Sequence, residues 1–520
     1  MHRLSFALIA VLLMVVAAAA PGVQAQSLPI ASAPPAAHEE KAGQDHAAAS
    51  AEHEHHGVVG ARMGLWLIIP FAGILLCIAL CPLFTPKFWH HHYGKVAAGW
   101  GALALLLMIL VGEGGGGGLM PALQSGAHVY LGDYLPFIIL LLTLFTIAGG
   151  IYVKGDFRGT PATNTTLLLI GTLIASFVGT TGASMLMIQP VLRANKARKR
   201  KAHIFVFFIF LVSNVGGSLT PLGDPPLFLG FLKGVDFFWT MHLVPETSFA
   251  AGCLLVAFFI IDTMMYRRDP LPPMDPAAPR EKFGIQGAHN LLFLGGMIAA
   301  IVGSASLPNS IPALAGNIAL GDLVQLPIAG VCRDVIMLLM AALSLATTAK
   351  AIRVANNFNW APIKEVAKLF AGIFICMVPA LAILSAGSHG QLAFIVNSVQ
   401  QPWQYFWATG SLSSFLDNAP TYLVFFQTAQ STPMAEFAAR GLSPDPVSHL
   451  VDMPHIILAS ISCGAVFMGA NTYIGNAPNF MVKAVAEQND VKMPSFLGYM
   501  LWSICILIPL FIVMSFIFFR

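Results

Sequence analysis

A polar segment rich in glycine and proline interrupts a long apolar stretch near the middle of the chain. The segment, Ser213–Pro226, reads SNVGGSLTPLGDPP and lies between the apolar runs His203–Val212 and Leu227–Leu232. Backbone exposed to lipid must hydrogen-bond internally, so such a break is tolerated in a membrane only against protein or a water-filled cavity. A second break, GANTYIGNAPN at Gly469–Asn479, lies near the other end. Two breaks in corresponding places predict a site built from interrupted helices, as in many transporters.

The composition is that of an integral membrane protein. Of the 520 residues, 57% are hydrophobic and only 10% are charged, whereas a soluble domain carries about 25% charged residues. Many apolar runs of roughly 20 residues predict an all-α polytopic membrane protein whose partner is the lipid bilayer. The net charge of +3 is too small to indicate a nucleic-acid partner. The seven cysteines are scattered through apolar runs, which is typical of small buried residues.

The N-terminal region has two parts. Residues 1–25 combine a basic start, an apolar stretch and a small-residue cleavage site, which predicts a signal peptide; a first transmembrane helix is the alternative. Residues 26–61 are rich in Ala, Pro, His and Glu and predict a disordered tail. The tail is interpreted as a solvated leader rather than a metal site, because it has no spaced ligand set. A cleaved signal peptide indicates a bacterial inner-membrane protein whose mature N-terminus is periplasmic.

The rest of the chain divides into two halves with the same order of segments. Residues 62–266 and 288–520 each hold three spans, a polar-centred segment, a broken span and a closing span, and a cytoplasmic linker at 267–287 joins them. Five crossings in each half is an odd number, so the second repeat is inverted relative to the first. The unbroken spans are expected near Gly64–Phe84, Lys95–Val111, Asp133–Val153, Val244–Tyr266, Ala288–Ser304, Val331–Thr348, Leu369–Gly387 and Phe496–Phe519, with loops at Pro86–Lys95 and Gly112–Gly132. The broken spans are expected at His203–Lys233 and Met453–Glu487.

The polar-centred segments predict re-entrant hairpins. Thr163–Leu192 has basic residues on both flanks, so the positive-inside rule places both of its ends in the cytoplasm. Two full crossings need about 40 residues, and only about 30 are present. A hairpin that turns at Gly179–Ser184 satisfies both conditions, and one ordinary span is the alternative. Trp403–Gln427, with a polar centre at Ser411–Thr421, predicts a second hairpin that opens to the periplasm.

These segments resemble the ion transporter superfamily. The resemblance covers the chain after the tail and is most specific in SNVGGSLTPLGDPP, in LDNAPT at Leu416–Thr421 and in GANTYIGNAPN. It is similar to the branch of citrate transporters and D-type (NhaD-like) sodium:proton antiporters. The resemblance implies two clamshells of hairpin tip and helix break that hold sodium ions and substrate near mid-membrane. It also implies a homodimer and an elevator-like movement of the hairpin-bearing domain.

The hairpin tips depart from one branch of that superfamily. The dicarboxylate branch uses Ser-Asn-Thr at both tips, whereas this chain has Gly-Thr-Thr-Gly at Gly179–Gly182 and Leu-Asp-Asn-Ala-Pro-Thr at Leu416–Thr421. The Asp-Asn-x-Pro form looks more like the antiporter and arsenite branches, which puts dicarboxylate transport in doubt.

Asp224 and Asp417 are the leading candidates for ion binding. A carboxylate at membrane depth is costly and is a functional hypothesis by default. A hard cation such as sodium takes several oxygen ligands, and an aspartate in a low-dielectric site can exchange a proton for a cation. The alternative is that each aspartate caps the N-terminus of a half-helix, and the two roles are compatible.

The other candidates are polar residues of the tips and breaks. The asparagines alternatively satisfy unwound backbone, and the threonines alternatively bond back to their own helices. The full set of expected ion or substrate contacts is Thr180, Thr181, Ser184, Ser213, Asn214, Thr220, Asp224, Ser414, Asp417, Asn418, Thr421, Asn471, Thr472 and Asn476. Sodium is expected at Asn214, Asp224, Asp417 and Asn471. No catalytic residue and no cofactor is expected, apart from sodium ions and protons as coupling or transported ions.

The pattern as a whole predicts a secondary active transporter. Sodium/proton antiport is the leading hypothesis, because two acidic residues in one cavity oppose an anionic substrate unless sodium neutralises them. Cation-coupled transport of citrate or a related carboxylate is the alternative, since half-helix N-termini and free hydroxyl and amide donors favour anions. An intramembrane enzyme or an ATP-driven pump is disfavoured because the chain has no His-Glu-x-x-His and no Walker-type loop. The paired breaks favour alternating access over a channel.

Overall fold

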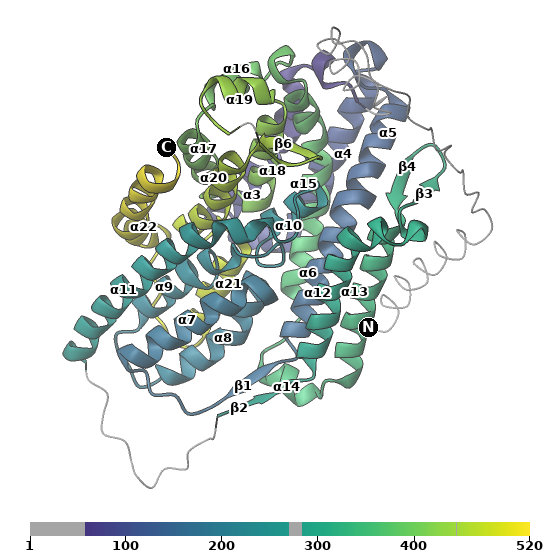
Figure 1. Ribbon diagram of the computed structural model, residues 1–520. Coiled ribbons are helices and arrows are strands. Elements are labelled where there is room, and N and C mark those ends of the chain that lie inside the picture. The colour runs from purple at the N-terminus through teal and green to yellow at the C-terminus, as the bar shows by residue number, and fades with distance from the viewer. Residues whose placement is uncertain (1–57, 270–282, 444) are drawn as a thin grey trace, which may run out of the picture.

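Two helical bundles lie side by side in the computed structural model, which describes residues 58–269, 283–443 and 445–520 (Figure 1). Nine helices in this part of the chain are long and apolar enough to cross a membrane. The protein is therefore an all-α polytopic membrane protein, as the composition predicts. The predicted signal peptide and residues 26–57 of the predicted tail lie outside the described residues.

The first bundle, called here the scaffold bundle, combines elements from both halves of the chain. Its long helices pack against each other and leave apolar side chains on the outer surface, where a bilayer would cover them. The scaffold helices are α3 (Ile69–Phe84), α4 (Pro86–Leu110), α5 (Leu119–His128), α6 (Leu135–Ala148), α12 (Asn290–Ser306), α13 (Ile328–Thr347), α14 (Lys350–Ala355) and α15 (Ala361–Ser385). A π-helical turn, Val129–Tyr134, joins α5 to α6.

The second bundle, called here the hairpin bundle, holds both hairpins and both broken helices. Figure 1 shows α7, α8, α9, α11 and α22 on its left side, away from α12 and α13. Its helices are α7 (Pro161–Val178), α8 (Thr180–Ala194), α9 (Ala202–Leu211), α10 (Pro225–Leu232), α11 (Val244–Arg268), α17 (Pro402–Ser413), α18 (Asn418–Gln430), α20 (His455–Met468), α21 (Ala477–Gln488) and α22 (Phe496–Phe518). The short helices α16 (Ala393–Ser398) and α19 (Met434–Ala439) flank the second hairpin in the chain.

The broken helices occupy the centre of the hairpin bundle. Every residue from Ile204 to Val212 in and after α9 is fully buried, and α20 is almost as completely enclosed. A helix that is hydrophobic on all sides must be surrounded by other elements. This placement buries both breaks, at 212–224 and 469–476, deep inside the protein.

The first hairpin turns at a single residue. Gly179 has φ of +77°, a conformation that favours glycine, and it connects α7 directly to α8. The predicted turn of Gly179–Ser184 is therefore too long, because Thr180–Ser184 already form the first turn of α8. The second hairpin has a longer tip, from Ser414 to Asp417, between α17 and α18.

Three antiparallel strand pairs connect elements at the ends of the bundles. They are β1 (Tyr152–Lys154) with β2 (Gly284–Gln286), β3 (Asn317–Leu320) with β4 (Val324–Pro327), and β5 (Pro446–Ser448) with β6 (Val451–Pro454). The β1–β2 pair joins the segment before α7 to the segment that enters α12. Part of the predicted linker at 267–287 is thus regular, since α11 continues to Arg268 and β2 precedes α12.

Three expected irregular segments are ordered. Pro86–Lys95 is the start of α4 rather than a loop, because its lysines and histidines are accommodated on the helix beyond the apolar part. Most of Gly112–Gly132 is helical, with α5 beginning at Leu119. The last residues of the predicted tail, Val58–Ala61, pack on the protein, where Val58 N donates to Ser125 Oγ over 3.1 Å.

Candidate ion and substrate site at the helix breaks

Each hairpin tip is fastened to the break of the broken helix beside it by a serine and a threonine. Ser176 Oγ donates to Gly216 O over 2.6 Å, and Thr220 Oγ1 donates to Ser176 O. In the second half, Ser414 Oγ lies 3.1 Å from Met468 O, at the end of α20, and 2.7 Å from Gly410 O of its own helix. Thr472 Oγ1 donates to Ser414 O over 2.5 Å. The two breaks therefore share one pattern of contacts with their hairpins. These two threonines do not bond back to their own helices.

Asp224 lies where the hairpin tips and the breaks meet. Its carboxylate accepts hydrogen bonds from Thr180 Oγ1 over 2.9 Å, from Asn476 Nδ2 over 3.1 Å and from Asn418 Nδ2. These donors come from α8, from the second break and from α18, so three segments far apart in the chain converge on one side chain. All four residues are buried.

Four helix N-termini meet at this carboxylate. Asp224 and Asn476 are the N-cap residues of α10 and α21, while Thr180 and Asn418 are the first residues of α8 and α18. The free N–H groups of a helix N-terminus carry partial positive charge. The site therefore combines one carboxylate with four positively polarised helix ends.

A chain of polar contacts extends from Asp224 into the first break. The amide of Asn476 also donates to Ser213 O over 3.2 Å and to Asn214 Oδ1 over 3.3 Å. Ser213 Oγ shares a hydrogen bond of 2.8 Å with Ser184 Oγ on the first hairpin. We call the seven residues Ser184, Ser213, Asn214, Thr180, Asp224, Asn418 and Asn476 the Asp224 cluster.

Asp417 has a different position from Asp224. Its Oδ1 accepts a hydrogen bond of 3.1 Å from Ala419 N, so it caps α18 with its side chain. Asp224 is at an N-cap position too, but its side chain makes no such capping bond. The capping alternative thus describes Asp417, and the carboxylate of Asp224 is used in contacts between segments.

A second, smaller polar group surrounds Ser414. Asn471 Nδ2 donates to Ser414 Oγ over 2.9 Å, and Thr472 is bonded to the same residue. Ser503 of α22 donates to Asn471 O over 2.8 Å. Of the four expected sodium ligands, Asn214 and Asp224 belong to the Asp224 cluster. Asn471 contacts Ser414, and Asp417 caps α18 directly before Asn418 of the cluster.

Two buried amide oxygens in these groups have no hydrogen-bond partner among the described residues. They are Asn418 Oδ1, in the Asp224 cluster, and Asn471 Oδ1, beside Ser414. A buried polar atom without a partner is costly and calls for a ligand, an ion or a water. Both oxygens are of the type that a hard cation accepts as ligand.

The remaining expected residues have simpler environments, and two residues that the sequence did not single out take part. Thr421 Oγ1 bonds back to Asp417 O over 3.1 Å, and Thr181 lines a cavity beside Asp224. Asn479 accepts from Asn214 Nδ2 over 2.8 Å and thereby links the two broken helices. The sequence could have indicated Asn479, because this residue ends the motif GANTYIGNAPN. Ser176 lies three residues before Gly179 and had no distinguishing neighbour in the sequence.

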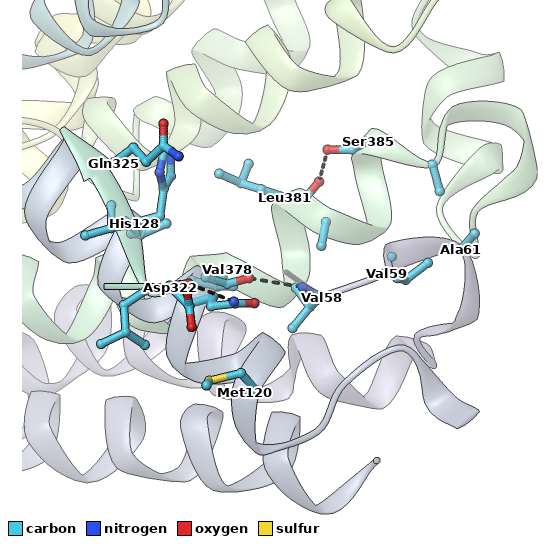
Figure 2. Close-up of a pocket in the computed structure, with 18 of the residues that line it drawn as sticks. Val58, Val59, Ala61, Met120, His128, Asp322, Gln325, Val378, Leu381 and Ser385 are labelled. Atoms are coloured by element: carbon cyan, nitrogen blue, oxygen red, sulfur yellow. Dashed lines mark hydrogen bonds between the residues drawn. The ribbon is translucent and has the colours of Figure 1, made fainter. Parts of the chain in front are cut away.

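Two cavities lie at opposite ends of α15. The smaller one, the Asp224 cavity, has a volume of about 70 Å³ and is lined by Thr180, Asp224, α6 and the first turns of α15 at Pro362 and Ile363. The larger one, the His128 cavity, has about 950 Å³ and is lined by α5, the β3–β4 pair and the last turns of α15. Figure 2 shows His128 beside Gln325 and, further along, Leu381 and Ser385 of α15. The larger cavity belongs to the scaffold bundle and does not include the Asp224 cluster.

Bundles of this kind, with two hairpins and two broken helices around one buried polar cluster, define a membrane transport protein. A family model with the description "Putative citrate transport" matches residues 60–519, and the chain belongs to that family. The protein is accordingly a multi-pass membrane transporter. No curated protein matches the chain.

Proposed function

We propose that the protein couples the transport of a carboxylate, with citrate as the representative substrate, to the movement of a cation through the Asp224 cluster. The observation that carries this proposal is the meeting of four helix N-termini at one buried carboxylate. Helix N-termini favour an anionic group. Asp224 opposes the same group electrostatically until a cation neutralises it. Binding of the anion therefore requires a sodium ion or a proton.

The oxygen atoms near Asp224 suit such a cation. The carboxylate of Asp224 and the free Oδ1 of Asn418 are both hard oxygen donors. No basic side chain of the described residues forms an ion pair with Asp224, whose partners are Thr180, Asn418 and Asn476. A buried carboxylate without a paired charge is costly, and a bound sodium ion or proton offsets that cost.

Sodium/proton antiport is the second candidate function. The absence of a basic partner at Asp224 among the described residues favours it, because one carboxylate could bind a proton and a sodium ion in turn. The family description favours the carboxylate. For that reason we place carboxylate transport first, whereas the sequence alone favours sodium/proton antiport.

The proposal includes the wider architecture expected from the sequence. We propose two inverted repeats, a homodimer in the bacterial inner membrane and a periplasmic N-terminus. The matching serine and threonine contacts at the two breaks support the repeats. The basic residues between Arg193 and Lys201, after the first hairpin, support a cytoplasmic position for that end.

The purified protein in liposomes that contain a pH-sensitive dye tests the function. Sodium is added first and citrate second, with the membrane potential clamped. A response to a cation gradient only when citrate is present supports cation-coupled carboxylate transport. Sodium-driven proton movement without citrate would contradict it and establish sodium/proton antiport.

A further inference from the structure

An ion pair joins the two bundles. Lys233 Nζ lies 2.7 Å from Asp133 Oδ2 and 2.9 Å from Asp133 Oδ1, so it contacts both carboxylate oxygens. Lys233 follows α10 in the hairpin bundle, and Asp133 lies in the π-helical turn between α5 and α6 of the scaffold bundle. Asp133 is buried and Lys233 is partly exposed, so the pair lies at the edge of the interface.

Helix α10 connects this pair to the candidate site. Asp224 is the N-cap residue of α10 and Lys233 is its C-cap residue. At a rise of about 1.5 Å per residue, the two positions are about 13 Å apart along the helix axis. Because α10 is a single helix of eight residues and is largely buried, a displacement of Lys233 relative to the scaffold also displaces Asp224.

A second contact along α10 has a different character. The guanidinium of Arg333 on α13 lies 5.9 Å from the ring centroid of Phe228, in the middle of α10, while its Nε donates to Asp334 over 2.8 Å. The charge of Arg333 is thus paired within the scaffold bundle. Its contact with α10 is through an aromatic face, which constrains position less than a two-oxygen ion pair does.

The segment that carries Asp133 of the ion pair is continuous with the lining of the His128 cavity. The segment that contributes His128 and Val129 to the His128 cavity continues directly into the turn that contains Asp133. In Figure 2, His128 points into that cavity beside Gln325. Asp224 adjoins the separate cavity at the opposite end of α15. The ion pair therefore joins the helix that begins at Asp224 to the segment that lines the His128 cavity.

From this placement we infer that Lys233 and Asp133 form a lock between the bundles, which keeps the Asp224 cluster closed toward the His128 cavity and must open in each transport cycle. The inference rests on the proposed function in that it assigns the pair a step in transport. Lys233 and Asp133 are positioning residues, because neither contacts Asp224. The pair acts through α10, which carries Asp224 at its other end.

The distance between spin labels at Asp236, beyond α10, and at Asp322, in the β3–β4 turn, shows whether the two bundles are locked together. The measurement needs no substrate. We expect one distance distribution in the otherwise unmodified protein and a second population in Lys233→Gln and in Asp133→Asn. Exchange of the charges, Lys233→Asp with Asp133→Lys, should restore the original distribution, which loss of fold would not do. Distributions in both single variants that equal the original would overturn the inference.

A disulfide at the same place tests the link to transport. In a background without the native cysteines, oxidation of Lys233→Cys/Asp133→Cys should lower transport by at least about tenfold, and reduction should restore it. The matched control is Ile318→Cys/Leu326→Cys, which joins opposite positions of β3 and β4 in the scaffold bundle that do not line the His128 cavity, and it should leave transport unchanged. Full transport by the cross-linked pair would overturn the inference. If the protein without cross-links moves no citrate and no sodium, the proposed function fails, and the spin-label result still decides whether the lock exists.

Discussion

The side-chain amide of Asn418 donates a hydrogen bond to Oδ2 of Asp224, although 194 residues separate them in the chain. Asn418 begins the second arm of the second hairpin, and Asp224 ends the break of the first broken helix. The contact brings the two halves of the chain to one carboxylate. The remaining Oδ1 of Asn418 has no partner among the described residues, so the same residue offers an oxygen to a cation.

Asn476→Ala is expected to weaken cation binding. The substitution removes an amide that contacts Asp224, Asn214 and Ser213, and leaves the carboxylate with fewer donors. Loss of one such bond corresponds to about 1.4 kcal/mol, or a tenfold higher KM for the coupling cation. The measurement is transport as a function of cation concentration in liposomes.

Asn489→Ala is the matched control for this variant. Asn489 follows the other end of the same helix, α21, and its amide contacts only Val485 O at the surface. An unchanged KM in Asn476→Ala would remove Asn476 from the cation site.

Asp262→Ala is expected to destabilise the fold strongly. The carboxylate of Asp262 is fully buried and pairs with Arg198 over 2.6 Å and with His203 over 2.8 Å. Removing one partner of a buried pair leaves an uncompensated charge and costs about 3–5 kcal/mol. Thermal unfolding in detergent should show a lower Tm.

The control for Asp262 is an ion pair at the surface. Glu487→Gln removes the partner of Lys483 on α21, and such an exposed pair contributes about 0.5 kcal/mol or less. Equal values of Tm for the two variants would contradict a structural role for the contacts of Asp262 with Arg198 and His203.

Gly179→Ala should disturb the first hairpin. Gly179 adopts φ of +77° and ψ of 150°, a region open essentially to glycine alone, where an L-residue costs about 1–3 kcal/mol. Relief of that strain would move Thr180, the next residue, away from Asp224, so both Tm and transport should fall. Gly99→Ala in α4, where an added Cβ meets no atom within 4 Å, should lower neither, because alanine is the better helix former. A Tm for Gly179→Ala equal to that of Gly99→Ala would show that the turn is not strained by a side chain.

Asp417 should behave as a helix cap. Asp417→Ala removes the bond to Ala419 N and should cost about 1 kcal/mol, whereas asparagine is itself a good cap and should cost little. Transport should persist in Asp417→Asn. Loss of transport with an unchanged Tm in that variant would instead make Asp417 an ion ligand.

The positions of the helix breaks could be predicted from the sequence because a cluster of glycine, proline and asparagine inside an apolar span interrupts helical hydrogen bonding. The helices α10 and α21 begin at Pro225 and Ala477, inside the two polar motifs. The short length and basic flanks of Thr163–Leu192 predicted the first hairpin, and the polar centre of Trp403–Gln427 predicted the second. The predicted length of the first hairpin turn was wrong, because Thr-Thr-Gly is compatible both with a loop and with the first turn of a helix.

The different contacts of Asp224 and Asp417 could not be predicted. Each is followed within three residues by proline at the start of a half-helix, so their local sequences are alike. The difference arises from tertiary contacts: Thr180, Asn418 and Asn476 reach Asp224, whereas Asp417 bonds to its own helix. The prediction of a loop at Pro86–Lys95 was wrong for another reason. Charge alone does not show where a helix ends outside the membrane.

The most direct test of the account is uptake of radiolabelled citrate into liposomes by the unmodified protein, Asp224→Asn and Asp417→Asn, each with an imposed sodium or proton gradient. We predict gradient-driven uptake that falls to the level of protein-free liposomes in Asp224→Asn and persists in Asp417→Asn. Undiminished uptake by Asp224→Asn would contradict the assignment of Asp224 as the residue that couples cation to substrate.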